Sequence, residues 1–76
     1  MVEPLGSVPV GCEAVVQGLR KGRSQRRLLD LGFVPGTRVR VVRASPLGDP
    51  RAYLVRGTVI ALRREDAAEV MVSRGR

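Results

Sequence analysis

The stretch from Arg27 to Val41, RLLDLGFVPGTRVRV, constrains the fold more than any other part of this chain. It predicts the end of a short helix over Gln25–Leu31, a stop at Gly32, a turn over Val34–Thr37 and a strand over Arg38–Ala44. Proline followed by glycine at the centre of the turn is typical of a type II turn, which needs a positive φ at its third residue. A helix this short is held by packing rather than by propensity. The stretch contains no catalytic group, which favours a small binding domain over an enzyme.

Both ends of the predicted helix carry recognisable signals. Ser24 is expected to be the N-cap, with its hydroxyl accepting from the free amides of the first turn. Gly32 fits the left-handed position after the last turn, and Phe33 is then placed to pack on Leu28 in a Schellman-type contact. Leu28 and Leu31, three residues apart, are expected to face the core.

The rest of the chain shows short β-strand patterns separated by glycine and proline. Arg38–Ala44 alternates between apolar and basic residues until the adjacent Val41 and Val42 break the period, which predicts a β-bulge. Arg56 and Gly57 are expected to form a hairpin turn. The remaining predicted elements are strands at Glu13–Leu19, Ala52–Val55, Thr58–Leu62 and Val70–Val72, and a single helical turn at Arg64–Ala68.

Five short strands with one helix inserted after the first must close on themselves to bury a core and hide their edges. We therefore expect a mainly β fold, a small SH3-like five-stranded β-barrel with one short inserted α-helix. At 76 residues the chain is expected to form one domain over residues 1–76. Its core is modest, because a domain of this size buries only about 60% of its unfolded surface.

The residue inventory excludes most catalytic chemistry. The chain has no histidine and a single cysteine, Cys12. Neither an internal disulfide nor the usual Cys/His zinc site can therefore form within one chain. The acidic residues follow no calcium-loop spacing, and no glycine-rich phosphate-binding motif is present. We predict that the protein is not an enzyme and has no catalytic residue, cofactor or metal ligand, with Cys12 packed at the start of a strand.

The formal net charge is +7 at pH 7, from 14 basic and 7 acidic residues. Such a charge attracts nucleic acid, acidic protein surfaces or anionic lipid headgroups. No apolar run approaches the ~20 residues needed to cross a bilayer. The N-terminal residues, with an acid at Glu3, do not resemble a signal peptide. We expect a cytoplasmic protein, with a peripheral position at the inner face of the plasma membrane as an extension of that expectation.

A series of motifs runs along the chain: Arg27–Gly32 (RLLDLG), Pro35-Gly36, Ala44–Pro50 (ASPLGDP), Val55–Gly57 (VRG) and Ala61–Ala67 (ALRREDA). Their order and spacing resemble the FeoA family, the small cytosolic accessory proteins of bacterial ferrous iron uptake. The resemblance covers essentially the whole chain and implies an SH3-like β-barrel with an inserted helix. It also implies a non-enzymatic accessory or regulatory role, through protein–protein interaction with FeoB, a membrane ferrous iron transporter with a cytosolic GTPase domain.

The basic run, Arg20–Arg27 (RKGRSQRR), is the first candidate for partner binding. Arg20, Lys21 and Arg23 are predicted to form an electrostatic patch against an acidic surface of the transporter or the nearby anionic membrane. The alternative is a solvated loop that keeps the protein in solution.

Two further candidates are apolar or rigid. Leu29 points away from Leu28 and Leu31, so it serves either as core or as an exposed partner contact. The loop Ser45–Pro50 (SPLGDP) contains the candidates Pro46, Leu47, Gly48, Asp49 and Pro50, and its prolines reduce the entropy lost on binding. The alternative for this loop is a plain connection in which Gly48-Asp49 makes the turn.

The main alternative function is a basic small-barrel nucleic-acid-binding module. The charge supports it, but Phe33 and Tyr53 are the only aromatic residues, and a single-strand reader normally needs an aromatic stacking platform. We therefore expect no specific nucleic-acid partner. Self-association into a homo-oligomer is a further expectation, because an exposed barrel edge or apolar patch can drive it.

Overall fold

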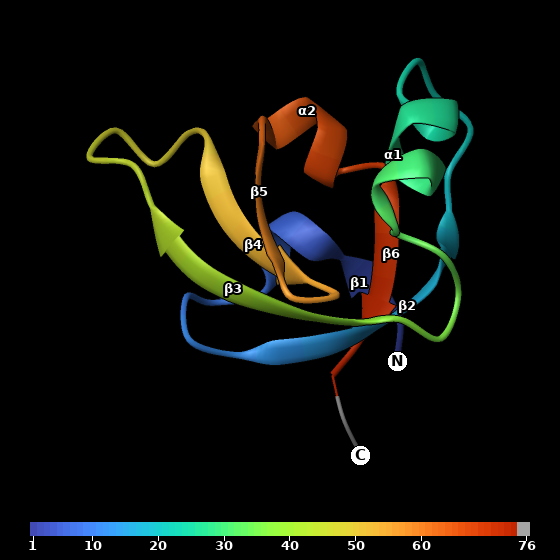
Figure 1. The fold of residues 1–76 in the computed structure, drawn as a ribbon, viewed down its shortest axis with the longest axis horizontal. Coiled ribbons are helices and arrows are strands. Elements are labelled where there is room, and N and C mark those ends of the chain that lie inside the picture. Colours follow the sequence, from blue (N-terminus) through green and yellow to red (C-terminus); the bar gives the residue numbers. More distant parts are fainter. Residues whose placement is uncertain (75–76) are drawn as a thin grey trace.

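The computed structural model describes residues 1–74, which form one sheet of six antiparallel strands (Figure 1). The strand order is β1-β6-β2-β3-β4-β5. The strands are β1 (Glu3–Pro4), β2 (Glu13–Leu19), β3 (Arg38–Ala44), β4 (Arg51–Val55), β5 (Thr58–Leu62) and β6 (Val70–Ser73). The helical segments are the 3-10 turn η1 (Leu5–Ser7), α1 (Gln25–Leu31) and α2 (Arg64–Ala67). None of these helices is long and apolar enough to cross a membrane.

All five predicted strands are present, with α1 inserted after the first of them, and β1 is a sixth strand that was not predicted. β1 pairs with β6, so that Glu3 lies opposite Val72 and Pro4 opposite Met71. Two residues are too few to show an alternating pattern, and proline in a sequence argues against a central strand. β1 is an edge strand, where proline is tolerated.

A single hydrophobic core lies inside the curved sheet. The alternation predicted for β3 is confirmed, because Val39 and Val41 are buried whereas Arg38 and Arg40 are exposed. The register with β4 shifts at Val42, which confirms the predicted bulge. The core also contains Leu5, Val8, Ala14, Val16, Leu28, Phe33, Tyr53, Val55, Leu62, Ala67, Val70 and Val72.

Two short helical segments complete the barrel where strand pairing does not. Within residues 1–74 no pairing joins the edge strands β1 and β5. Instead η1, which follows β1, contacts α2, which follows β5. Arg51 of β4 adds a further link, because its guanidinium donates to the backbone oxygen of Gly6 at 2.7 Å and to that of Val8.

The C-terminal end of α1 matches its prediction. Gly32 has a φ of 108°, and the N–H of Phe33 donates to the carbonyl of Leu28 at 3.0 Å, the signature bond of the Schellman motif. Leu28 and Phe33 are both fully buried. The expectation that Leu31 faces the core is wrong, since its side chain is 37% exposed. Three residues advance a helix by about 300°, which turns Leu31 about 60° away from Leu28.

Ser24 is the N-cap residue of α1, as predicted, but the expected side-chain capping bond is absent. The Ser24 side chain makes no capping bond, and its hydroxyl donates instead to Oδ1 of Asp66 at 2.5 Å. The Ser24 backbone N–H donates to the carboxylate of Glu69, with distances of 3.2 and 3.4 Å to its two oxygens. A carboxylate is a strong acceptor for the Ser24 hydroxyl, so a tertiary hydrogen bond takes the place of the local capping bond.

The two predicted turns are confirmed. The N–H of Thr37 donates to the carbonyl of Val34 at 3.0 Å, and Gly36 has a φ of 91°. Arg56 and Gly57 both have positive φ, 52° and 79°. Positive φ at both central residues matches a type I′ hairpin turn, whose twist suits the flanking strands.

Candidate partner-binding surface

The predicted partner-binding residues lie in two separate places. The basic run and Leu29 belong to α1 and the segment before it, whereas residues 46–50 belong to the loop between β3 and β4. Figure 1 shows α1 at the upper right of the molecule and the β3–β4 loop at the upper left. The fold therefore presents two candidate surfaces rather than one site.

The basic run is held in place by the residue before β6. The N–H of Arg20 donates to the carbonyl of Glu69 at 2.7 Å, and the Glu69 carboxylate accepts from the N–H of Ser24. Gly22 lies so close to this carboxylate that a Cβ at that position would overlap it. The run is thus an ordered loop. Its exposed side chains include the three predicted contact residues, Arg20, Lys21 and Arg23.

Asp66 fixes the start of α1, a role that sequence reasoning missed. The residue is only 9% exposed, and its Oδ2 accepts from Nη2 of Arg27 at 2.7 Å while its Oδ1 accepts from Ser24. The signal available in the sequence is the pair Asp66 and Glu69, spaced three apart and opposite in charge to the basic run. Complementary charge of this kind indicates contact only once the topology is known.

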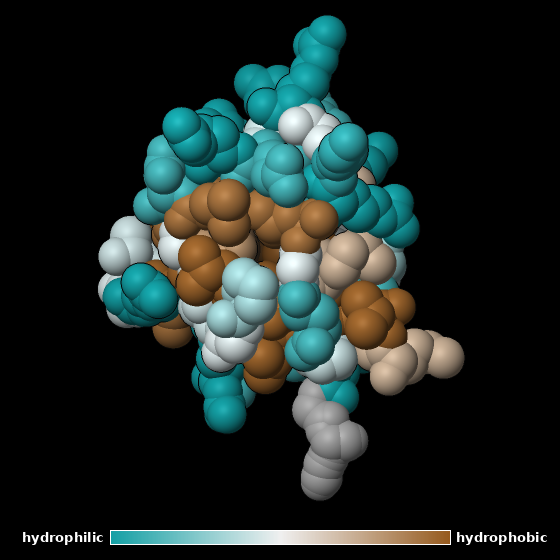
Figure 2. Space-filling model, turned by 90° about the vertical axis from the view of Figure 1, so that its right-hand side faces the viewer, coloured by the Kyte–Doolittle hydropathy of each residue, from teal (hydrophilic) through white to brown (hydrophobic). Residues whose placement is uncertain are grey.

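Two leucines of α1 are accessible to a partner. Leu29 is 39% exposed and Leu31 is 37% exposed, which places both at the surface. Figure 2, which faces the side of the molecule carrying α1, shows apolar side chains gathered beneath a region of hydrophilic residues. The basic run immediately precedes α1 in the chain, so charged and apolar candidates lie close together on this side.

The β3–β4 loop presents Leu47 at its tip, where the side chain is 92% exposed. The N–H of Gly48 donates to the carbonyl of Ser45 at 2.8 Å, so the turn covers residues 45–48 and the expected Gly48-Asp49 turn is wrong. Asp49 is used elsewhere: its Oδ1 accepts from the backbone N–H of Arg64 at 2.9 Å, at the start of α2. This bond ties the loop to α2. Pro46, Gly48 and Pro50 are exposed.

Both aromatic residues, Phe33 and Tyr53, are fully buried, so neither presents a ring face to a nucleic-acid base. Burial raises the pKa of the Tyr53 phenol above its ordinary value. The nearby Arg51 cation opposes that rise in pKa and the Asp49 carboxylate adds to it. The Arg51 guanidinium lies 5.6 Å from the centroid of the Tyr53 ring.

Metal-ligating side chains are dispersed over the described part of the chain. Within residues 1–74 no three His, Cys, Asp or Glu side chains lie close enough together to hold a metal ion. Cys12 is half-buried and packs against the core immediately before β2, as predicted.

The chain matches known proteins along almost its whole length. The family model of the FeoA domain matches residues 3–74. A relative in Porphyromonas gingivalis, a Fe(2+) transport protein A/Fe(2+) transporter FeoB fusion protein, is 38% identical over 69 residues. That match covers 90% of this chain but 8% of the relative, so the chain spans a small part of that protein's length.

Solved structures share the fold. A FeoA-like protein from Clostridium acetobutylicum has a TM-score of 0.91 and 28% identity, covering 96% of this chain and 86% of its own. The FeoA of Stenotrophomonas maltophilia, solved with zinc and described as a prokaryotic SH3 domain protein, has a TM-score of 0.82 and 36% identity. It covers 96% of this chain and 89% of its own, which confirms the SH3-like fold class. The chain belongs to the FeoA family.

Proposed function

We propose that this chain is a non-enzymatic accessory or regulatory protein of bacterial ferrous iron uptake, acting in the cytoplasm as a single FeoA-like domain. Its partner is a FeoB-type transporter, bound through the cytosolic GTPase domain. Membership of the FeoA family and the fusion of FeoA to FeoB in the Porphyromonas gingivalis relative support this proposal. Fusion keeps two domains at a high effective concentration, which favours partners that act together.

The proposed contact surface rests on the exposure of two α1 leucines beside an ordered basic run. The α1 surface comprises Arg20, Lys21, Arg23, Leu29 and Leu31. Protein interfaces commonly have an apolar centre and a polar rim, and this surface offers both. Its positive charge accelerates encounter with an acidic partner surface.

The β3–β4 loop is proposed as a second contact with the same partner. Leu47 is its most exposed apolar side chain, while the bond from Asp49 to α2 and the two prolines restrict the loop before binding. A restricted loop loses less conformational entropy when it docks.

Calorimetric titration against the FeoB-type GTPase domain tests the proposal at about 0.15 M salt, where charges more than ~8 Å apart are screened. We expect saturable binding. Leu29→Ala and Leu31→Ala should each raise the dissociation constant by about fivefold to tenfold, because each removes an apolar contact from the interface. Leu47→Ala reports on the loop in the same assay.

The matched control is Val59→Ala, which truncates a 51% exposed side chain on β5, outside both candidate surfaces. All these side chains are exposed, so their truncation should change stability by less than about 0.5 kcal/mol. No binding in any nucleotide state would contradict the proposed partner. Equal weakening by Val59→Ala would contradict the α1 surface.

The net charge of +7 also supports peripheral binding to anionic membrane at the inner face of the plasma membrane. Sedimentation with vesicles containing anionic lipid, compared with neutral vesicles, tests this extension. Light scattering of the free protein tests self-association, for which the β5 edge is the candidate.

A further inference from the structure

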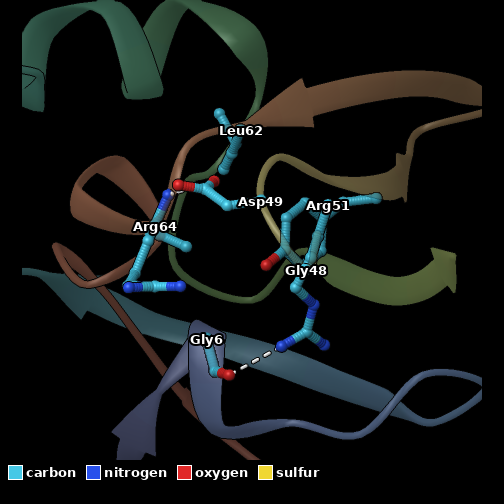
Figure 3. Close-up of a pocket in the computed structure, with 8 residues that line it drawn as sticks. Gly6, Gly48, Asp49, Arg51, Leu62 and Arg64 are labelled. Carbon is cyan, nitrogen blue, oxygen red and sulfur yellow. Dashed lines mark hydrogen bonds between the residues drawn. The ribbon is translucent and has the colours of Figure 1, made fainter. Parts of the chain in front are cut away.

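A pocket on the side of the barrel between the β3–β4 loop, η1 and α2 is separate from the α1 surface. Its cavity volume is about 230 Å³, and the residues that line it include Gly6, Asp49, Arg51, Tyr53 and Arg64 (Figure 3). Sites for drug-sized ligands usually occupy roughly 300–1,000 Å³, so this pocket suits something smaller. It lies where helical segments rather than strand pairing complete the barrel.

Two buried hydrogen-bond donors at this pocket have no acceptor. Tyr53 is fully buried, and its hydroxyl has no hydrogen-bond partner within residues 1–74. The Nε of Arg51 is likewise buried without a partner in the same part of the chain. Buried polar groups are nearly always paired, and an unpaired one destabilises the fold. Both groups belong to residues that line this pocket, so an acceptor bound in it would lie beside them.

The charge around the pocket specifies the kind of acceptor. Arg51 is fixed by its bonds to the backbone oxygens of Gly6 and Val8, so its guanidinium is preorganised. Arg64 takes part in none of the ion pairs found within residues 1–74. Figure 3 shows the side chains of both arginines extending toward the Gly6 end of the pocket, while the Asp49 carboxylate lies beside the backbone of Arg64.

We propose that this pocket binds a small oxyanion, a phosphate or carboxylate group. The anion is held between the guanidinium groups of Arg51 and Arg64 and accepts the hydrogen bond of the Tyr53 hydroxyl. Guanidinium groups bind both kinds of anion through paired charge-assisted hydrogen bonds. Asp49 opposes the anion and limits its affinity, while holding the loop that forms one wall.

NMR titration of the full chain with inorganic phosphate, and separately with succinate, tests the proposal against sodium chloride of equal ionic strength. We expect saturable shifts at the amides of Gly48 and Arg64 and at the Arg51 Nε–H. Arg64→Gln should weaken binding by about tenfold. The matched control is Arg63→Gln, which removes the same charge from an exposed neighbour that does not line the pocket.

Two further variants separate a binding role from a structural one. Tyr53→Phe should weaken anion binding by about threefold while leaving the melting temperature of the free protein unchanged or higher, because it removes an unpaired buried hydroxyl. Asp49→Asn keeps an oxygen acceptor for the Arg64 N–H and should tighten binding. Glu65→Gln, the same charge change on the exposed face of α2, should not.

Saturation by phosphate alone identifies a tetrahedral oxyanion, and saturation by both probes identifies a general oxyanion site. Either result supports the proposal. Three results overturn it: no saturable shift with either probe, equal weakening by Arg63→Gln and Arg64→Gln, or unchanged binding by Tyr53→Phe. The first would mean that the pocket binds neither anion. The second would mean that the positive charge of the whole molecule attracts the anion. The third would mean that the Tyr53 hydroxyl does not contact it.

Discussion

At the scale of single residues, Gly32 is a position where the backbone conformation disfavours a side chain. Its φ is 108°, and a Cβ there would lie 3.4 Å from both Arg56 and Val55. We predict that Gly32→Ala lowers the free energy of unfolding by about 1–2 kcal/mol, because an L-residue is strained in this conformation. Urea denaturation measures the change.

Gly18→Ala is the matched control for that substitution. Gly18 does not have a positive φ, and no atom beyond Gly18 itself and its two chain neighbours lies within 4 Å of the position that its Cβ would occupy. Its free energy of unfolding should stay within about 0.5 kcal/mol of the unchanged protein. An equal loss in both variants would show that the conformation of Gly32 is not the cause.

Ionisation of Tyr53 should destabilise the folded protein at alkaline pH. Burial raises the phenol pKa above its ordinary value of 10.0, so the folded state holds this proton more tightly than the unfolded state does. The contribution of the protonated phenol to stability is therefore fully present below about pH 10. That contribution is lost as the pH rises from there through the raised pKa. Because the chain has one tyrosine, tyrosinate absorbance follows its ionisation directly.

We predict that denaturation midpoints fall between about pH 9 and pH 11 in the unchanged protein and fall less in Tyr53→Phe. Identical pH profiles for the two proteins would contradict the assignment to Tyr53.

At the scale of secondary-structure elements, features set by neighbouring residues could be predicted from the sequence, whereas features set by residues distant in the sequence could not. The bounds of α1 and β3 were predictable because Gly32 and the turn ending at Thr37 are local signals that fix where one element stops and the next begins. The absence of the Ser24 capping bond was not, because the carboxylates that accept from its hydroxyl and its backbone N–H lie 42 and 45 residues away, at Asp66 and Glu69. No local pattern encodes such contacts.

The candidate surfaces follow the same division. The exposure of the basic run and of Leu47 could be predicted, because charge and loop position suffice for it. The pocket around Tyr53 could not, because its walls come from η1, β4 and α2, which meet only in the fold. Leu31 was misplaced because spacing along a two-turn helix does not say which of its leucines the sheet covers.

The anchoring of the N-terminal end of α1 by Glu69, between α2 and β6, leads to a prediction. Glu69→Ala should lower the free energy of unfolding by about 1 kcal/mol, because the buried side of the basic run loses its charged acceptor. It should also speed hydrogen exchange at the Ser24 amide, whose N–H donates to that carboxylate.

Glu65→Ala is the control, since Glu65 lies exposed in the first turn of α2. It should cost only a few tenths of a kcal/mol, from its interaction with the helix dipole, at roughly the magnitude usual for surface residues. Unchanged exchange at Ser24 in Glu69→Ala would mean that the loop is held by its backbone bonds alone.

At the scale of the whole molecule, the positive charge should act on the rate of partner encounter more than on the final affinity. We predict that reversing Arg20, Lys21 and Arg23 to glutamate slows association with the FeoB-type GTPase domain by about tenfold at low salt. The effect should shrink as salt is raised. Stopped-flow or surface-plasmon measurements give the rates.

A control of equal charge reverses Arg40, Arg43 and Arg63, which are exposed on other parts of the chain. If this control slows association as much, net charge alone steers the encounter. If only the α1 surface variant is slow, steering is local to the side of the molecule that carries α1.

The pairing of β1 with β6 brings the two ends of the described chain together, and an ion pair between Glu3 and Arg74, 2.7 Å long, fastens them. The N-terminus lies at the end of the molecule opposite α1 (Figure 1). A tether attached near either end therefore leaves from the same side. If the molecule is immobilised on a sensor or joined to another domain through either end, α1 should face away from the attachment point. Either end should therefore serve equally well for attachment.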